Sequence, residues 1–415
     1  MESYENKRKS FYNKMNHFWP DLYGEEYALY DIATIDQKGI EDIRLGTRRA
    51  GLIFFKACHL LRNVDDQILI DLGFPKETLY FLRLKTIRTE SVIARLDLIH
   101  TDNTYKCIEI NSDTPTFIKE LFDVNGHAAE EFGFDNPNAG MDQQLAKAVR
   151  ESIISSAKWL NEVEPYIVFT AHDDNIEDKN TVLYLQNLYG LPAKFIPLHK
   201  LKIEPGKGLF DEHGMRINIL YRQTFPIENL IFDEDMNGNK IGQWLLELVQ
   251  ARKLAIINPP SAFLLQNKAV QAVIWGLHES GNDFFTKDEH SWIEEYFLPT
   301  YLEPDPFLTK GQPYVKKPVF GREGDTVQIF DSSGKLIMEE AQKTYSDVLS
   351  IYQQYVELPQ ITYYCEKGKR KGHKLIGSFM INGQPSAIGF RVGGEITNNL
   401  SCFLPVGVSK EKGGQ

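Results

Sequence analysis

The segment RLDLIHTDNTYKCIEINSDTPT, residues 95–116, places charged side chains inside two short apolar runs. Charges in such runs are costly unless they are paired, solvated or bound to a ligand. Polar and apolar residues alternate over 95–100 and over 106–111, which predicts two antiparallel strands. We expect a three-residue loop, 102–104, to join these strands into a hairpin.

A hairpin with this loop brings Asp97 directly opposite Glu109, and Arg95 opposite Asn111. These four side chains then share one face, because strand side chains alternate with a period of two. The other face is filled by Leu96, Leu98, Ile108 and Ile110. Opposed carboxylates destabilise a strand pair unless a cation lies between them, and Mg²⁺ prefers such oxygen ligands when it also binds phosphates. The register therefore predicts a magnesium site, with Arg95 beside it for a phosphoryl group. A two-residue turn is the open alternative, since it moves Glu109 to the other face.

The rest of the chain divides into regions with different patterns of expected helices and strands. Short strand-like and helix-like runs alternate between residues 164 and 260, which predicts a Rossmann-like unit with a parallel sheet. A long helix over 264–279 and several hairpin strands follow. The sequence therefore predicts an α/β (α+β) protein in three parts: a helical part with the metal-binding hairpin at 1–163, an α/β domain at 164–260, and a nucleotide-binding lobe at 261–415.

Composition and charge exclude some classes of function. The 415 residues carry a formal net charge of −11, whereas a nucleic-acid binder normally shows a basic face. The dense basic run KGKRKGHK, 367–374, is interpreted as a solvated hairpin loop. No apolar run approaches the about 18–20 residues of a membrane span, and the four cysteines show no CxxC spacing. We expect a cytoplasmic protein that binds neither nucleic acid nor a membrane; its oligomeric state leaves no signal in the sequence.

A second group of residues is suited to holding phosphates. The stretch 314–330 reads as a strand, a glycine-rich turn with Gly321 and Gly324, and a second strand. No helix follows the glycines, so this is neither a Walker loop nor a dinucleotide fingerprint. Such a hairpin can close over a triphosphate with a strand lysine, here Lys317, beneath it. Lys268 stands near the start of an apolar helix. When each motif is considered alone, alternatives remain: the glycine-rich turn could be an ordinary hairpin, and Lys268 could be a solvated lysine.

In combination these motifs resemble the synthetase domain of the glutathionylspermidine synthase family. The order over roughly residues 15–408 is R-x-D, E-x-N, D-T-P-T, N-K-A, K-P-x-x-G-R-E-G, Q-Q-Y-x-x-L-P and I-G-x-R. The resemblance implies a permuted ATP-grasp fold with a Rossmann-like pre-ATP-grasp domain, and an ATP-dependent carbon–nitrogen ligase that uses ATP and Mg²⁺. We expect a member without the amidase domain of bifunctional relatives, because the Cys/His arrangement of that domain is missing.

The resemblance also implies roles for individual residues. The magnesium ligands would be Asp97, Glu109 and Asn111. Catalysis at the transferring phosphoryl group or the acyl phosphate would fall to Arg95 and Arg391. The nucleotide would be held by Lys268, Lys317, Gly321, Gly324, Gln354 and Tyr355. The two substrates would meet Thr114, Thr116, Glu177, Asp178, Arg222 and Thr224.

The expected reaction proceeds through an acyl phosphate. A substrate carboxylate attacks the γ-phosphoryl group of ATP, and an amine then displaces phosphate to form an amide. The acid would be a peptide or an amino acid and the amine a polyamine or another small amine, and the sequence identifies neither. Two alternatives stay open: an ATP-binding homologue without ligase activity, regulatory or degenerate, and a metal phosphohydrolase.

Overall fold

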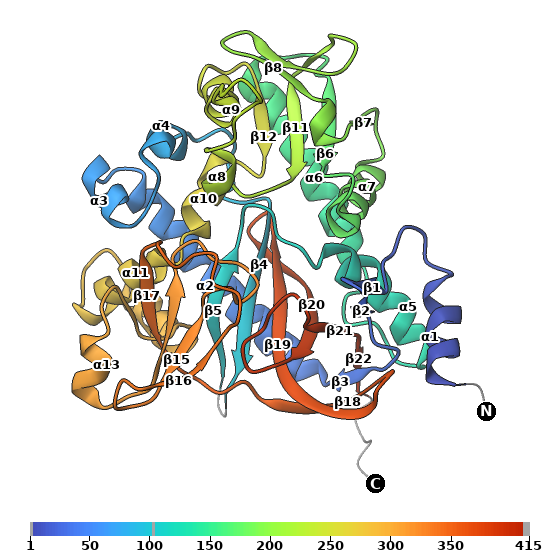
Figure 1. Cartoon of the computed structure of the whole chain (residues 1–415), viewed down its shortest axis with the longest axis vertical. Coiled ribbons are helices and arrows are strands. Elements are labelled where there is room, and N and C mark those ends of the chain that lie inside the picture. The colour runs from blue at the N-terminus through green and yellow to red at the C-terminus, as the bar shows by residue number, and fades with distance from the viewer. Residues whose placement is uncertain (1–2, 102–103, 410–415) are drawn as a thin grey trace.

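The computed structural model describes residues 3–101 and 104–409, and it has a mixed α/β architecture with several sheets (Figure 1). The predicted fold class is confirmed. Within the described ranges, no helix is long and apolar enough to cross a membrane. Three sheets position the candidate site: one of six strands, one of five, and a parallel one of four.

The six-stranded sheet joins two distant parts of the chain. Its order is β21-β20-β19-β4-β5, with β18 paired to β19. The strands are β4 (Ile93–His100), β5 (Tyr105–Asn111), β18 (Gln360–Cys365), β19 (Gly368–Ile381), β20 (Gln384–Gly393) and β21 (Cys402–Leu404). The long helix α2 (Gln37–Leu61) packs against β19, β20 and β5 (Figure 1). The predicted hairpin is therefore not an isolated ribbon but one side of a large sheet.

The basic run 367–374 is only partly the loop that was expected. From Gly368 onward its residues belong to β19 and pair with β18, up to His373 opposite Gln360. The loop interpretation fails because β18 is rich in aromatic and β-branched residues, which favour a paired strand. Solvation was predicted correctly for Lys369, Arg370 and Lys371, which are exposed.

The five-stranded sheet has the order β13-β17-β14-β15-β16. Its strands are β13 (Thr300–Tyr301), β14 (Tyr314–Pro318), β15 (Gln328–Phe330), β16 (Leu336–Glu339) and β17 (Ser350–Gln354). The helix α11 (Ala269–Glu279) packs against β13 and β17. This sheet and its helix lie in the lower left of Figure 1, beside β5.

The long helix predicted over 264–279 is in fact two helices, α10 (Pro260–Gln266) and α11. Asn267 separates them in an extended conformation, and its Oδ1 accepts a hydrogen bond from the backbone N–H of Ala269 at 2.7 Å. An asparagine oxygen that satisfies a free N–H of the first turn starts a new helix. The break places Lys268 at the entrance of α11, where its own N–H donates to Val319 O at 2.9 Å.

The four-stranded parallel sheet forms the upper lobe in Figure 1 and has the order β12-β11-β6-β7. Its strands are β6 (Ile167–Ala171), β7 (Lys194–Phe195), β11 (Ile219–Gln223) and β12 (Ala255–Ile257), and its helices include α6 (Met141–Leu160), α7 (Ile176–Tyr189) and α9 (Ile241–Gln250). Every residue of β6, β11 and β12 is buried, as in a parallel sheet covered on both faces. This sheet lies within the stretch predicted to be Rossmann-like.

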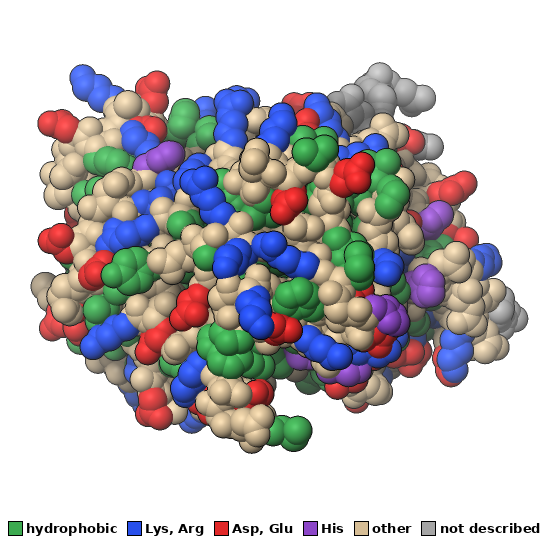
Figure 2. Space-filling view, turned by 90° about the horizontal axis from the view of Figure 1, so that it is seen from above, with side chains coloured by type: hydrophobic (Ala, Val, Ile, Leu, Met, Phe, Trp, Pro, Cys, Tyr) green, Lys and Arg blue, Asp and Glu red, His purple; other side chains and the backbone are tan. Residues whose placement is uncertain are grey.

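The remaining elements are short. They are α1 (Tyr4–Tyr12), α3 (Asp66–Asp71), α4 (Leu79–Leu82), a π-helical turn at Glu120–Val124, α5 (Asn125–Glu131), α8 (Ile227–Leu230), α12 (Lys287–Tyr296), α13 (Asp305–Lys310), β1 (Asp21–Leu22), β2 (Glu25–Glu26), β3 (Ala33–Ile35), β8 (Lys202–Glu204), β9 (Gly208–Phe210), β10 (Arg216–Ile217) and β22 (Val406–Val408). Seen from above, acidic and basic side chains are interspersed on the face of the upper lobe (Figure 2). Such a surface differs from the basic face of a nucleic-acid binder.

Candidate active site

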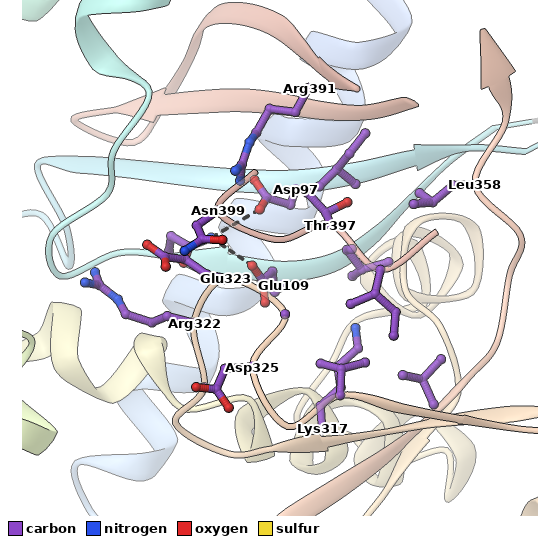
Figure 3. Close-up of a pocket in the computed structure, with 18 of the residues that line it drawn as sticks. Asp97, Glu109, Lys317, Arg322, Glu323, Asp325, Leu358, Arg391, Thr397 and Asn399 are labelled. Atoms are coloured by element: carbon purple, nitrogen blue, oxygen red, sulfur yellow. Dashed lines mark hydrogen bonds between the residues drawn. The ribbon is translucent and has the colours of Figure 1, made fainter. Parts of the chain in front are cut away.

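The charged face of the β4–β5 hairpin opens into a pocket. Asp97 lies directly opposite Glu109, and Arg95 lies opposite Asn111, as the sequence predicted. All four side chains line the same pocket. Asp97 and Glu109 lie at its centre in Figure 3, with Arg391 pointing in from above and Lys317 from below.

The register at the site depends on a β-bulge and not on the expected loop. The loop 102–104 lies partly outside the described residues, but the pair beside it, His100–Tyr105, follows the register of a two-residue turn. One extra residue, Ile108, then shifts the pairing and restores Asp97 opposite Glu109. The prediction that Ile108 fills the opposite face is wrong, because the bulge turns it into the pocket.

Asp97 is held by a guanidinium from its own strand. Arg95 donates to it twice, from Nε to Oδ1 at 2.7 Å and from Nη2 to Oδ2 at 3.0 Å. The Nδ2 of Asn111 lies between the two carboxylates, 3.4 Å from Asp97 Oδ2 and 3.2 Å from Glu109 Oε1. The same amide, turned over, presents its oxygen to a cation in that position.

Two lysines from other elements face Glu109. The Nζ of Lys268 lies 3.2 Å from Glu109 Oε2 and donates to Gly321 O at 2.7 Å. Burial works to raise the pKa of Glu109, but Lys268 and Lys317 outweigh it and lower that pKa below its usual range. Burial lowers the pKa of Lys317 to about 8. The site is therefore an alternation of fixed negative and positive charges.

This donor set fits a magnesium ion that shares its coordination with phosphates. Two carboxylates and an amide face one space, and Mg²⁺ is usually held by one or two carboxylates together with substrate phosphates and water. Within residues 3–101 and 104–409, no cluster of three His, Cys, Asp or Glu side chains could hold a metal ion alone. Phosphate and water oxygens could complete the coordination of a cation bound by Asp97 and Glu109.

The far end of the pocket is apolar and suits a purine ring. Ile99, Leu358 and Leu375 form a small cluster, against which Ile108 and Val356 pack. Gln354 and Tyr355, which were predicted to contact the nucleotide, also line the pocket. The bulge therefore serves both ends of the pocket, since it presents Glu109 to the charged end and Ile108 to the apolar end.

The glycine-rich turn covers the pocket together with a segment near the C-terminus. Gly321 and Gly324 both line the cavity, as do Arg391 and Thr397. Gly324 has a φ of +72°, and a Cβ built on it would lie 2.7 Å from Thr397 O. This position therefore requires glycine for two reasons, the left-handed conformation and the close approach of the residue 397 backbone.

The predicted substrate residues divide into two groups. Thr114, Thr116 and Glu177 line the pocket, whereas Asp178, Arg222 and Thr224 are not among its lining residues. Arg222 is 1% exposed and forms an ion pair with Asp113, and its Nη1 donates to Thr224 Oγ1 at 3.3 Å. Arg222 therefore fixes the segment that follows β5 to the parallel sheet.

Glu177 brings a carboxyl group to the substrate side of the pocket. Burial, together with the negative charges of Glu120 and Asp178, raises the pKa of Glu177 to about 8. A cationic ligand nearby would reverse this shift, because opposite charge favours the ionised carboxylate.

The sequence analysis missed several residues of the pocket. Arg322 donates from Nη2 to Thr114 O at 3.0 Å and to Thr114 Oγ1 at 2.8 Å, so it joins the glycine-rich turn to the segment after β5. Its place between the two glycines was a usable signal. Tyr23 and Tyr27 also line the pocket, but they come from a segment without any motif. The further polar lining residues missed are Glu323, Asp325, Gln353, Glu395, Thr397 and Asn399.

Comparisons with known proteins agree with this architecture. The model of the family described as glutathionylspermidine synthase pre-ATP-grasp matches residues 4–409. A Haemophilus influenzae protein named "Putative acid--amine ligase" is 23% identical over 331 residues, which are 75% of this chain and 73% of that protein. A glutathione synthetase-like effector from Globodera pallida, solved in its apo form, matches with a TM-score of 0.58 at 14% identity, over 99% of this chain and 98% of that one. The last likeness concerns the fold, which is of the ATP-grasp type. The chain belongs to the glutathionylspermidine synthase pre-ATP-grasp family.

Proposed function

We propose that the protein is an ATP-dependent carboxylate–amine ligase that forms an amide through an acyl phosphate. The observation that carries this proposal is a single pocket in which the opposed Asp97 and Glu109 meet Arg95, Lys268 and Lys317 beside an apolar end. Such a pocket suits a triphosphate with its metal ion and a purine. The family and its acid–amine ligase relative support the same reaction class.

In the proposed reaction, an oxygen of the substrate carboxylate attacks the γ-phosphorus of ATP, and the bond to the bridging oxygen of ADP breaks. A neutral amine then attacks the acyl carbon, phosphate leaves, and the nitrogen loses a proton. Arg95, Arg391 and the two lysines would stabilise the transferred charge, and the reaction requires no protein nucleophile. Mg²⁺, when bound by Asp97, Glu109 and Asn111, would neutralise charge on the phosphates.

The substrates of this proposal are small molecules. Thr114, Thr116 and Arg322 would face the carboxylate, which belongs to a peptide or an amino acid. Glu177 would face the amine, for which a polyamine is the candidate that the family name suggests. We also propose that the domains meet near residues 163 and 260. The proposed location of the protein is the cytoplasm.

A screen of carboxylate and amine pairs for coupled ADP release tests the proposed function. A ligase releases ADP over many turnovers only when both the acid and the amine are present, and amide appears in equal amount. ADP release without any acceptor would instead indicate a phosphohydrolase. Nucleotide binding without turnover for any pair, in a screen that includes peptides, amino acids and polyamines, would indicate an ATP-binding homologue without ligase activity.

A further inference from the structure

Lys317 enters the pocket at the end of a buried chain of hydrogen bonds. Its Nζ donates to Gln353 Oε1 at 2.9 Å. The Nε2 of Gln353 donates to Gln271 Oε1 at 3.2 Å and to Thr300 Oγ1 at 3.1 Å. The Nε2 of Gln271 in turn donates to the carbonyl of Ile108 at 3.2 Å. The chain therefore runs from the bulge of β5, through α11 and β17, to the lysine.

The chemistry of the partners leaves one orientation for Gln353. An ammonium group only donates, so the amide oxygen of Gln353 must face Lys317. Both of its N–H groups then point at acceptors. Thr300 can accept because its own hydroxyl donates to Leu298 O at 2.9 Å. Gln353 is 1% exposed, Gln271 2% and Thr300 0%. The buried amide of Gln353 has its oxygen and both N–H groups hydrogen-bonded. A fully satisfied buried amide is held rigidly, so the Gln353 oxygen is a fixed acceptor.

This fixed acceptor decides where the charge of Lys317 lies. In the described part of the chain, Gln353 is the one hydrogen-bond partner of the Lys317 Nζ. An ammonium group has three donors, so two remain for the pocket. Glu109 attracts Lys317 from the other side. Without the Gln353 oxygen, the lysine side chain is free to turn toward Glu109 and to neutralise a carboxylate that the metal ion needs.

We propose that Gln353, anchored by Gln271 and Thr300, is a positioning residue that aims Lys317 at the phosphates of the bound nucleotide. The inference rests on the proposed function, because it requires the pocket to bind a triphosphate. In the motif Q-Q-Y the expected nucleotide contacts were Gln354 and Tyr355. The preceding glutamine, Gln353, accepts from Lys317 and acts through that lysine.

The test is calorimetric binding of the magnesium complex of AMP-PNP and, separately, of adenosine. Gln353→Met keeps the length of the side chain and removes the acceptor. We expect the Kd of the AMP-PNP complex to rise on the order of tenfold, the effect of one hydrogen bond to a charged group. The Kd of adenosine should not change. Gln360→Met, at an exposed position of β18, is the matched control and should leave both constants unchanged.

A double-mutant cycle separates positioning from a structural role. In the Lys317→Met background, Gln353→Met should change the AMP-PNP Kd by less than about twofold, because the residue through which it acts is gone. An equal loss in both backgrounds would overturn the proposal. Thr300→Val, which removes one anchor and keeps Gln353, serves if Gln353→Met does not fold, and it should weaken AMP-PNP binding by a few fold.

Two further outcomes distinguish failure of the positioning role from failure of the proposed function. If the wild-type protein binds AMP-PNP and Gln353→Met binds it equally well, the positioning role is wrong and the proposed function stands. If the wild-type protein does not bind AMP-PNP, the proposed function itself fails.

Discussion

The two hairpins that meet at the pocket balance their buried charges in different ways. In β4–β5 the partners are close in sequence: Asp97 is held by Arg95, two residues away, and by Asn111. In β14–β15 the buried Lys317 is held by Gln353, 36 residues later, and faces Glu109, which lies more than two hundred residues earlier. The first hairpin is a local unit, and the second is completed by the rest of the fold.

This difference implies different responses to substitution. A change in the local unit removes a proposed metal ligand and leaves a buried partner charge unpaired at the same time. A change in the second unit removes one positive charge from a set of several.

Asp97→Asn should have the largest effect. The substitution removes a carboxylate from the proposed metal ligands and leaves Arg95, which is 5% exposed, without its counter-charge. We expect ADP release coupled to amide formation to fall by at least about a hundredfold, the usual effect of losing a group that stabilises transition-state charge. Asp283→Asn, at an exposed position, is the control. Full activity of Asp97→Asn would contradict the metal assignment.

Lys317→Met should act mainly on nucleotide binding. In the proposed site this side chain is one of several cations at the phosphates, so we expect the KM for ATP to rise about tenfold while kcat falls less. Steady-state kinetics over a range of ATP concentrations measures both constants. A fall in kcat as large as that of Asp97→Asn, with the KM for ATP unchanged, would remove the distinction between the two hairpins.

The stability of the Gly324→Ala variant tests how closely the glycine-rich turn packs against the backbone of residue 397. Gly133 has nearly the same φ, +73° against +72°, but nothing lies within 4 Å of a Cβ built there. Gly133→Ala should therefore lower the free energy of unfolding by only about 1 kcal/mol, the cost of an alanine in the left-handed conformation. Gly324→Ala should lose more, because its Cβ meets Thr397 O. Urea denaturation of the two variants measures the difference, and equal losses would mean that the contact with residue 397 yields easily.

The pH dependence of stability should reveal Glu177. Because its pKa is raised to about 8, the folded protein binds more protons than the unfolded chain between the usual carboxyl pKa and pH 8. Stability therefore falls as pH rises through that range. Glu177→Gln should reduce this fall in a comparison of Tm at pH 5.5 and pH 8. The exposed Glu164→Gln should not, and an unchanged slope in Glu177→Gln would place the ionisation elsewhere.

The contrast between the hairpins also explains what the sequence could predict. Asp97 and Glu109 are twelve residues apart, so strand period together with a three-residue loop predicted their pairing. The bulge at Ile108 could not be predicted, because one apolar residue in an alternating strand looks like its neighbours. The pairing was right for a reason that the sequence did not contain.

Long-range contacts account for the other differences. Arg222 stands at a strand end, as substrate residues often do. Its charge is instead paired with Asp113, which lies 109 residues earlier in the sequence. Arg322 was visible inside the glycine-rich motif, yet only the fold brings it to Thr114. Gln353 looked like one more polar residue of a strand, and its role depends on partners from α11 and β13.

Isotope transfer from the acid substrate tests the acyl phosphate most directly. Once the screen has identified a productive pair, the acid is supplied with ¹⁸O in its carboxylate, and the released phosphate is analysed by mass spectrometry. Attack of a carboxylate oxygen on the γ-phosphoryl group predicts one ¹⁸O atom in each phosphate. Phosphate without the label, formed in step with the amide, would contradict the mechanism and the assignment of the pocket that rests on it.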